Sequence, residues 1–296
     1  MVKRLNLKAY GKINLGLDVL RKREDGYHEV RMIMQTVGIY DKIELIYQEK
    51  PEITVETNLY YLPNNENNLV YKAADLLMKE FETEGGVHIN LKKFIPVSAG
   101  MAGGSADAAA VLVGLNKMLG LGLSREQLME RGVKIGADVP YCIMRGTALS
   151  EGIGDVLTPL PPVPQCHVLI AKPGISVSTK FVYGNLHLDK LKLGQHPDID
   201  GMVKAIRERD LDGIAGRFGN ILETVTISAY PVIQEIKDTM TELGALGALM
   251  SGSGPTVFGL FTDKRTADKA YEELRYGKKS EIAKQVYLTD FYNVED

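Results

Sequence analysis

The stretch Pro96–Asp107, rich in glycine, alanine and serine, constrains this chain more than any other feature. It follows the alternating segment Val87–Lys93, which predicts a strand, and leads into Ala108–Leu119, which is apolar nearly all round and predicts a buried helix. Its three glycines let the backbone approach a ligand closely, and the start of a helix adds unpaired N–H donors and a positive dipole end. The stretch therefore predicts a binding site for an anionic phosphate group.

A simpler interpretation of this stretch is a turn of small residues that lets a helix pack tightly on a sheet. Glycine alone would favour that interpretation. The strand–loop–helix setting, with Ser98 and Ser105 in the loop, favours the anion site instead.

The spacing of the stretch excludes the commonest nucleotide-binding motifs. It is not G-x-x-x-x-G-K-[ST], because the pairs Gly11-Lys12 and Gly277-Lys278 are not followed by serine or threonine, and it is not G-x-G-x-x-G. The chain also lacks H-E-x-x-H and G-x-S-x-G. A Walker-type NTPase, a Rossmann dehydrogenase and the common metalloprotease and hydrolase classes therefore lose their signatures.

The composition is that of a soluble globular protein, and its near-balance of charge argues against a partner bound mainly through excess charge. Hydrophobic residues make up 45% and charged residues 25%, and the formal net charge is −3, which argues against nucleic acid or anionic membrane as a partner. Residues 1–7 show no secretory signal, and no apolar run approaches the roughly 18 residues of a membrane-spanning helix. Two cysteines, Cys142 and Cys166, are too few for a disulfide scaffold or a four-thiolate zinc site. We expect a cytoplasmic enzyme.

Strand-like and helical patterns are mixed along the chain without strict alternation, which predicts an α+β fold. Strands are expected over Leu5–Tyr10, Ile13–Leu20, Glu29–Ile39, Lys42–Tyr47, Val87–Lys93, His167–Ala171, Ala248–Ser251, Thr256–Thr262 and Gln285–Phe291. Helices are expected over Asn67–Phe81, Ala108–Leu119, Ser124–Val133, Ile199–Arg209, Val232–Leu243 and Arg265–Arg275. The segment Ser124–Gln127 predicts a capping box at the start of the third of these helices. Turns are expected at Asp25-Gly26 and Tyr40-Asp41.

A chain of 296 residues is long enough for two domains. The densest proline cluster, at Pro159, Pro161, Pro162 and Pro164, predicts the boundary between them. We therefore expect an N-terminal catalytic domain over residues 1–160 and a C-terminal domain over residues 161–296.

Four other candidates have an ordinary structural explanation when each is taken alone. Lys12 could be a solvated lysine at a strand edge, and Asp138 could be a loop aspartate bonded to its own backbone. Asp25–His28 could be a plain turn, and Ser251–Pro255 could be an ordinary hairpin.

Together, however, three separated blocks resemble the signature motifs of the galactokinase, homoserine kinase, mevalonate kinase and phosphomevalonate kinase superfamily. The blocks are Ala9–Leu15, Pro96–Ser105 and Met250–Pro255. Within that superfamily, four shorter segments resemble the kinases of the non-mevalonate isoprenoid pathway: Lys12–Leu15, Asp25–His28, Gly136–Pro140 and Gly146–Ala148. The similarity runs from about Lys8 to the last strand, and its one departure is Gly11, where alanine or proline is expected.

The resemblance implies a fold and an activity. It implies a ribosomal-protein-like α+β domain, a ferredoxin-like C-terminal domain and an active site in the cleft between them. It implies transfer of the γ-phosphoryl group of ATP, bound with Mg²⁺ as a co-substrate complex, to the 2-hydroxyl of the methylerythritol unit of a cytidine diphosphate sugar alcohol. No tightly bound cofactor is expected, the metal ligands are left unassigned, and the protein is expected to be a monomer or a weak homodimer.

The resemblance also assigns residue roles. Asp138 would accept the alcohol proton, and Lys12 would offset the charge on the phosphoryl group. Asn14 and Thr179 would hold the methylerythritol diphosphate, Tyr27 and Tyr183 would sandwich the cytosine, and His28 would read its edge. ATP would be bound by Asn68, Leu69, Pro96, Val97, Ser98, Ala99, Gly100, Met101, Ala102, Gly103, Gly104, Ser105 and Ala106.

Two alternatives remain open. A homoserine or mevalonate kinase would keep the glycine loops without the cytosine clamp, and Asp25–His28 argues against it. A catalytically silent nucleotide-binding regulator could lose the lysine or the aspartate, but both Lys12 and Asp138 are present.

Overall fold

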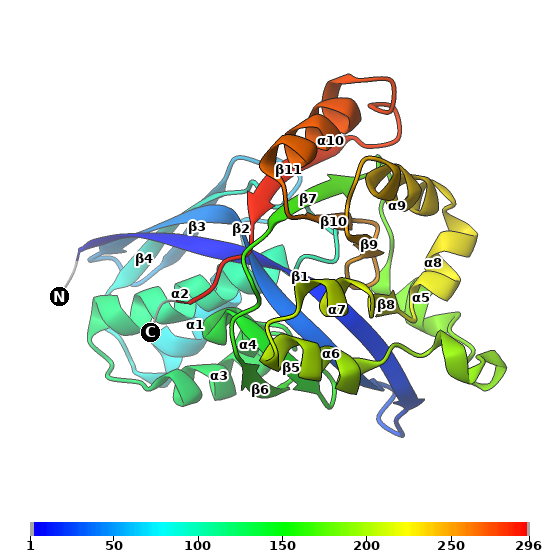
Figure 1. Ribbon diagram of the computed structural model, residues 1–296. Coiled ribbons are helices and arrows are strands. Elements are labelled where there is room, and N and C mark those ends of the chain that lie inside the picture. Colours follow the sequence, from blue (N-terminus) through cyan, green and yellow to red (C-terminus); the bar gives the residue numbers. More distant parts are fainter. Residues whose placement is uncertain (1–2, 295–296) are drawn as a thin grey trace. The chain divides into compact units, whose positions relative to one another are not determined.

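The computed structural model describes residues 3–294, which cluster into two compact units (Figure 1). Unit 1 comprises residues 3–11, Ile39–Val97 and Ala102–Met144, and unit 2 comprises Lys12–Gly38, Ser98–Met101 and residues 145–294. The long strands β1 and β2 contribute residues to both units. The predicted boundary between two domains at residue 160 stays a prediction.

Strands and helices are mixed throughout, which confirms the predicted α+β class. The strands are β1 (Arg4–Lys22), β2 (His28–Gln48), β3 (Ile53–Thr57), β4 (Gly86–Lys92), β5 (Thr147–Glu151), β6 (Val156–Leu160), β7 (His167–Lys172), β8 (Gly219–Asn220), β9 (Gly247–Met250), β10 (Val257–Phe261) and β11 (Gln285–Asp290). The α-helices are α1 (Leu69–Glu80), α2 (Gly103–Leu119), α3 (Arg125–Val133), α4 (Val139–Met144), α5 (Thr179–Gly184), α6 (Ile199–Arg207), α7 (Leu211–Ala215), α8 (Glu223–Ala229), α9 (Val232–Glu242) and α10 (Lys264–Tyr276). Two short 3₁₀ helices are η1 (Leu188–Lys190) and η2 (Leu193–Gln195).

Unit 1 is a sheet portion covered by helices. β4 pairs antiparallel with β2 and parallel with β3, so that alternate apolar residues such as Leu45 and Ile89 fall on one buried face. α1 and α2 lie side by side against these strands (Figure 1). Gly114 of α2 has no side chain because a Cβ there would collide with Leu7 and Leu45. The small residue lets the helix pack closely on the sheet.

Two helix starts of unit 1 follow from their sequence. Asn68 precedes α1, and its side-chain oxygen accepts a 3.1 Å hydrogen bond from the N–H of Val70. Ser124 precedes α3 and forms the predicted reciprocal capping box with Gln127. Both side chains satisfy N–H donors that the first helical turn leaves without partners.

Unit 2 contains a four-stranded antiparallel sheet with the order β11-β7-β10-β9. Its strands and the two helices in contact with it follow each other as β7, α9, β9, β10, α10 and β11, the β-α-β-β-α-β arrangement of a ferredoxin-like domain (Figure 1). This sheet confirms the C-terminal fold that the resemblance implied. Elsewhere in unit 2, β2 pairs with β5, β5 with β6, and β1 with β8.

The structure corrects several predicted element bounds. β1 and β2 are each continuous, so the predicted turn at Tyr40-Asp41 is wrong: Asp41 is fully buried within the strand. α2 begins at Gly103 rather than Ala108, because the small residues Gly103–Asp107 already adopt helical geometry. Eight short elements were not predicted from the sequence: β3, α4, β5, β6, α5, α7, β8 and α8.

No helix among residues 3–294 combines the length and the apolar character that crossing a membrane requires.

Candidate functional site

The glycine-rich loop has an unusual backbone. Ser98, Gly100 and Ala102 have φ values of 51°, 71° and 54°, so every second residue is left-handed. For Ser98 and Ala102, which carry a Cβ, this conformation costs about 1–2 kcal/mol each. Such strain persists only where the surroundings impose it, and left-handed residues at alternate positions are typical of loops whose N–H groups converge on an anion.

The loop ends at a helix start without a side-chain cap. Ala102 is the N-cap residue of α2 and makes no side-chain capping hydrogen bond to the first turn, which also contains no acidic residue. The first intrahelical hydrogen bond runs from the N–H of Ala106 to the carbonyl of Ala102, at 2.8 Å. The N–H groups of the first turn of this 17-residue helix therefore present donors and a positive dipole end to a ligand.

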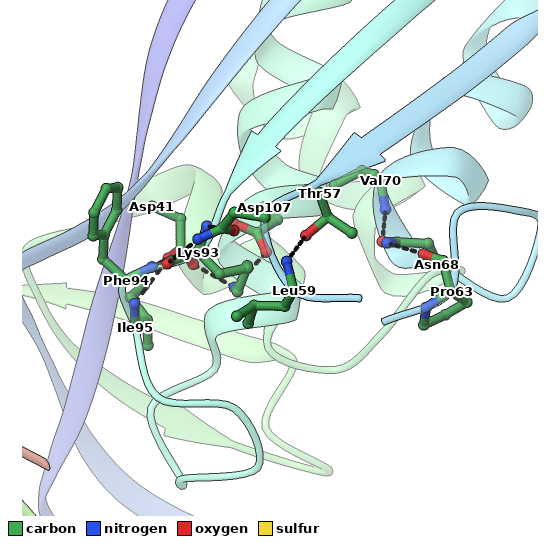
Figure 2. Close-up of polar contacts among 11 residues, drawn as sticks. Asp41, Thr57, Leu59, Pro63, Asn68, Val70, Lys93, Phe94, Ile95 and Asp107 are labelled. Carbon is green, nitrogen blue, oxygen red and sulfur yellow. Dashed lines mark hydrogen bonds and ion pairs between the residues drawn. The ribbon is translucent and has the colours of Figure 1, made fainter. Parts of the chain in front are cut away.

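A cavity of about 180 Å³ lies at this helix start, within unit 1. Six residues predicted to bind ATP line it: Asn68, Leu69, Pro96, Val97, Gly103 and Gly104. Asn68 is held there by its own contacts, because its amide also donates a 2.7 Å hydrogen bond to the carbonyl of Pro63, another lining residue (Figure 2). The structure thus brings the start of α1 and the start of α2 to one cavity.

In unit 2, the remaining loop residues meet the other two sequence blocks. The backbone N–H of Lys12 donates to the carbonyl of Met101 at 3.1 Å, and the hydroxyl of Ser251 donates to the carbonyl of Gly100 at 2.9 Å. A Cβ on Gly252 would lie 3.2 Å from that same Gly100 oxygen, so a side chain there would be crowded against the loop. Two segments far apart in the sequence therefore converge on the loop Ser98–Met101.

Lys12 is not a solvated lysine. It is only 4% exposed, and its ammonium donates a 2.6 Å hydrogen bond to the side-chain oxygen of Asn14, which is fully buried. The Asn14 amide in turn contacts the sulfur of Met32 at 3.2 Å. A buried ammonium with a neutral partner favours an anionic ligand, because burial of a charge is costly until it is compensated. The structure brings Lys12 and Asn14 together, and the roles assigned to them stay predictions.

The turn Ser251–Pro255 joins β9 and β10, as the hairpin interpretation predicts, and also makes contacts outside the hairpin. Asn220, which sequence reasoning missed, donates to the carbonyls of Met250 and Gly252, both at 2.8 Å. The hydroxyl of Ser253 lies 2.9 Å from that of Thr179, a predicted substrate residue at the start of α5.

The residues predicted to bind a flat base are partly brought together. The rings of His28 and Tyr183 lie 4.9 Å apart, centroid to centroid, at an interplanar angle of 41°. Burial, and to a lesser extent the ammonium of Lys22, lowers the pKa of His28, which favours the neutral ring at pH 7. Tyr27 follows the predicted turn at Asp25-Gly26 and is 61% exposed, so its ring is accessible to a ligand.

Asp138 lies in unit 1, just before α4, and is half-buried. Its backbone carbonyl accepts from the N–H of Cys142 at 3.1 Å. A Cβ on Gly136 would lie 3.9 Å from the hydroxyl of Ser105, so the loop before Asp138 borders the first turn of α2. Lys12 belongs to unit 2, and its cooperation with Asp138 stays a prediction.

A buried ionic cluster that sequence reasoning missed lies beside the cavity, which two of its members, Lys93 and Asp107, line. Figure 2 shows the contacts within the cluster. The ammonium of Lys93 contacts the carboxylates of both Asp41 and Asp107, and all three side chains are almost completely buried. Burial lowers the pKa of Lys93, but the interactions with Asp107 and Asp41 outweigh burial and raise that pKa above the usual value. One signal was available: Asp107 is a lone acidic residue in a helix that is apolar nearly all round.

No group of three or more histidine, cysteine, aspartate or glutamate side chains in residues 3–294 is arranged to hold a metal ion. The metal ligands therefore stay unassigned.

Comparison with known proteins identifies relatives over nearly the full length. Residues 68–146 match the family model of the GHMP kinases N terminal domain, and residues 202–279 match that of the GHMP kinases C terminal domain. A protein of Lachnoclostridium phytofermentans named 4-diphosphocytidyl-2-C-methyl-D-erythritol kinase is 56% identical, covering 97% of this chain and 97% of its own length.

Solved structures agree with these sequence matches. The crystal structure of a 4-(cytidine 5'-diphospho)-2C-methyl-D-erythritol kinase matches with a TM-score of 0.82 and 30% identity, covering 98% of this chain and 100% of the other. A homoserine kinase from Cytophaga hutchinsonii matches with a TM-score of 0.80, covering 98% of this chain and 95% of the other. At 22% identity, the latter shows a shared fold alone.

Proposed function

Because this chain belongs to the family of 4-diphosphocytidyl-2-C-methyl-D-erythritol kinases, we propose the following roles for its residues in the transfer of a phosphoryl group from ATP to 4-diphosphocytidyl-2-C-methyl-D-erythritol. The reaction places the γ-phosphoryl group on the 2-hydroxyl, in non-mevalonate isoprenoid precursor synthesis. The observation that carries the geometry is the uncapped start of α2 after a loop of alternating left-handed residues.

The triphosphate would bind to the N–H groups of the glycine loop and the first turn of α2. Ser105 would add a hydroxyl near the β- and γ-phosphate oxygens. The adenosine end would enter the cavity bordered by Asn68 and Leu69, which lies at the same helix start. Mg²⁺ would arrive as part of the MgATP substrate and neutralise phosphate charge.

Phosphoryl transfer from ATP passes through a loose transition state, so positioning and charge stabilisation matter most. Asp138 would accept the proton of the attacking hydroxyl. Lys12 would offset charge on the transferred group, a role that its burial supports, because an ammonium shielded from water interacts more strongly with an anion.

The cytidine end would bind through rings and hydrogen bonds. Tyr27 and Tyr183 would stack on the cytosine, and His28 would read its hydrogen-bonding edge. The contact of His28 with Tyr183 and the exposure of Tyr27 support this assignment. Asn14 and Thr179 would hold the methylerythritol diphosphate.

The fold does not separate this function from the two alternatives, since a homoserine kinase shares it. A different GHMP kinase would lack the cytosine-binding residues. A silent regulator would bind ATP without turning over any alcohol. Identity of 56% over nearly the whole chain favours the cytidyl substrate over both.

A coupled assay of ADP release tests the proposal with three acceptors: the cytidyl diphosphate alcohol, homoserine and mevalonate. We expect turnover with the first only, and thermal protection by cytidine nucleotides. Turnover with homoserine or mevalonate would support another kinase, and ATP binding without turnover would support the regulator.

The substitution Tyr27→Ala tests the cytosine assignment separately. We expect KM for the cytidyl substrate to rise about fivefold or more, since stacking is worth about 1–3 kcal/mol per base, while KM for ATP stays unchanged. Tyr276→Ala, at another exposed tyrosine, is the matched control and should change neither constant. An unchanged KM in Tyr27→Ala would remove this residue from the site.

The cytoplasmic location and the monomeric or weakly dimeric state remain proposals. Sedimentation of the purified protein over a range of concentrations tests the second.

A further inference from the structure

The buried cluster of Asp41, Lys93 and Asp107 connects the two ends of the glycine loop, residues 96–102, that precedes α2 (Figure 2). Lys93 stands just before the loop, and Asp107 follows it in the second turn of α2. The ammonium of Lys93 donates a 2.6 Å hydrogen bond to Oδ2 of Asp107 and a second bond to Oδ2 of Asp41. One ammonium therefore links the segment that enters the loop to the helix that leaves it.

Asp41 fixes the entering segment from the other side. Its Oδ1 accepts from the backbone N–H of Phe94 and, at 2.8 Å, from that of Ile95. A Cβ on Gly103 would lie 3.2 Å from the Lys93 nitrogen, so the ammonium lies against the first residue of α2. The donors of the helix start are thereby held at a set distance from residues 93–95.

The two carboxylates are not equivalent. Both oxygens of Asp41 accept hydrogen bonds, as suits a charged carboxylate. Asp107 is only 2% exposed, and its buried Oδ1 has no donor among residues 3–294. A charged oxygen in that position would be costly, whereas the neutral acid leaves only an uncharged carbonyl oxygen there, which costs less to bury.

The net charge of the cluster beside the cavity also favours a neutral Asp107. With both carboxylates ionised, the cluster would carry a net negative charge beside the cavity that Lys93 and Asp107 line. With Asp107 neutral, the cluster carries no net charge. A triphosphate binding at the start of α2 would be repelled in the first case and not in the second.

We propose that Asp107, as a neutral carboxylic acid tied to Lys93, is a positioning residue that fixes the first turn of α2 for phosphate binding. The inference rests on the proposed function in one respect, the identity of the anion as the polyphosphate of ATP. The charged groups that act on Asp107 are Lys93, after β4, and Asp41, of β2. Burial raises the pKa of Asp107 well above its usual value, which supports the neutral form.

Two variants separate shape from charge. Asp107→Asn keeps the shape and a neutral oxygen acceptor for Lys93, so the Kd for ATP should stay within about threefold of wild type. Asp107→Ala removes the tie, so the Kd for ATP should rise about tenfold or more, while kcat at saturating ATP changes less than about threefold. Should Asp107→Ala fail to fold, Asp107→Ser carries the same expectation.

A matched control measures ordinary loss of stability. Val111→Ala, one turn further along α2, removes two buried methyl groups away from the cavity and should lower Tm with the Kd for ATP unchanged. The proposal is overturned if Asp107→Ala binds ATP with the wild-type Kd. It is also overturned if either Val111→Ala or Asp107→Asn raises the Kd for ATP as much as Asp107→Ala does.

The Kd is measured by calorimetry with MgATP alone, without any alcohol. A wild-type protein that binds MgATP but phosphorylates no cytidyl substrate would contradict the proposed function and leave this test intact. Normal turnover of that substrate, with an Asp107→Ala variant that binds ATP like wild type, would contradict the positioning role alone.

Discussion

The hydroxyl of Ser251 donates a 2.9 Å hydrogen bond to the carbonyl of Gly100, so the turn after β9 fixes the orientation of a peptide group in the glycine loop. The next carbonyl, that of Met101, accepts from the backbone N–H of Lys12. In a trans peptide the N–H group points opposite to the carbonyl. Because two successive carbonyls are held in this way, the N–H groups of Met101 and Ala102 point to the other side of the loop, where they can donate hydrogen bonds to an anion.

The first prediction concerns this hydrogen bond. In Ser251→Ala the Gly100 carbonyl loses a buried donor, so the free energy of unfolding should fall by about 1–2 kcal/mol. KM for ATP should rise, because the peptide is no longer held. Urea unfolding and initial rates measure both quantities, and Ser228→Ala, which removes an exposed hydroxyl bonded within α8, is the control. Wild-type values of both in Ser251→Ala would contradict this reading of the contact.

The second prediction contrasts two glycines of the loop. Gly100 has φ of 71°, and a Cβ there would collide with the Ser251 carbonyl oxygen, so Gly100→Ala should destabilise the fold by about 2 kcal/mol or more. Gly104 is helical and lines the cavity, and the nearest atom to a Cβ there is 3.4 Å away, in Leu69. Gly104→Ala should therefore keep or slightly raise Tm.

Gly104→Ala should nevertheless weaken the binding of ATP, because the added methyl group occupies space where a phosphate approaches the N–H groups. We expect the Kd for ATP to rise about tenfold, or ~1.4 kcal/mol. Thermal unfolding and calorimetry on the same samples check both halves. Wild-type affinity in Gly104→Ala would place the phosphates elsewhere.

Local patterns predicted the loop, the capped helices and most longer strands, because those features depend on neighbours in the sequence. The capping box at Ser124 and the turn at Asp25-Gly26 are examples. Asp41 shows the opposite case. It resembles a turn residue next to Tyr40, but its partners are Lys93 and the N–H groups of residues 94 and 95, more than fifty positions away, and they keep it within a continuous strand.

Lys12 and Asn220 cannot be recognised from their local sequence for the same reason. A lysine between apolar residues resembles a strand-edge residue, and only tertiary packing buries it beside Asn14. Asn220 has no local signature, since it holds carbonyls 30 and 32 positions further on. Functional contacts made over long sequence separations were found here through family resemblance or through the structure.

The third prediction concerns Asp138. A positioned base contributes about 10²–10⁴ in rate, so Asp138→Ala should lose roughly 3–5 kcal/mol of transition-state stabilisation with little change in ATP binding. Initial rates and MgATP calorimetry measure the two effects. Asp238→Ala, at an exposed aspartate of α9, is the control and should behave as wild type. A kcat within about tenfold of wild type would remove Asp138 from the role of base.

The fourth prediction concerns thiol reactivity. Burial, with a smaller contribution from the Asp290 carboxylate, raises the pKa of Cys166 to about 12. The thiolate is the reactive form, so alkylation of Cys166 by iodoacetamide near neutral pH should be slow in the folded protein and fast in urea. Peptide mass mapping of both samples checks this. Equal labelling in the two states would show that Cys166 is accessible in the fold.

The fifth prediction follows from the protonation of Asp107. Burial raises its folded-state pKa above the unfolded value of about 3.9, and the adjacent Asp41 carboxylate adds to this shift while the Lys93 ammonium opposes it. Asp107 therefore binds its proton more tightly in the folded state. Its stabilising contribution is complete below the unfolded pKa and is lost as pH rises through the folded pKa.

Asp107→Asn has no such proton to lose. Its free energy of unfolding, relative to wild type, should therefore increase as pH rises from about 4 toward 8, by about 1.4 kcal/mol for each unit of pKa shift within that range. Urea unfolding at several pH values measures the difference, with Asp238→Asn as a surface control that should give a flat difference. A flat difference for Asp107→Asn as well would mean that Asp107 titrates alike in both states. In that case the cluster beside the nucleotide cavity would carry a net negative charge at neutral pH, and the neutral-acid role of Asp107 would be lost.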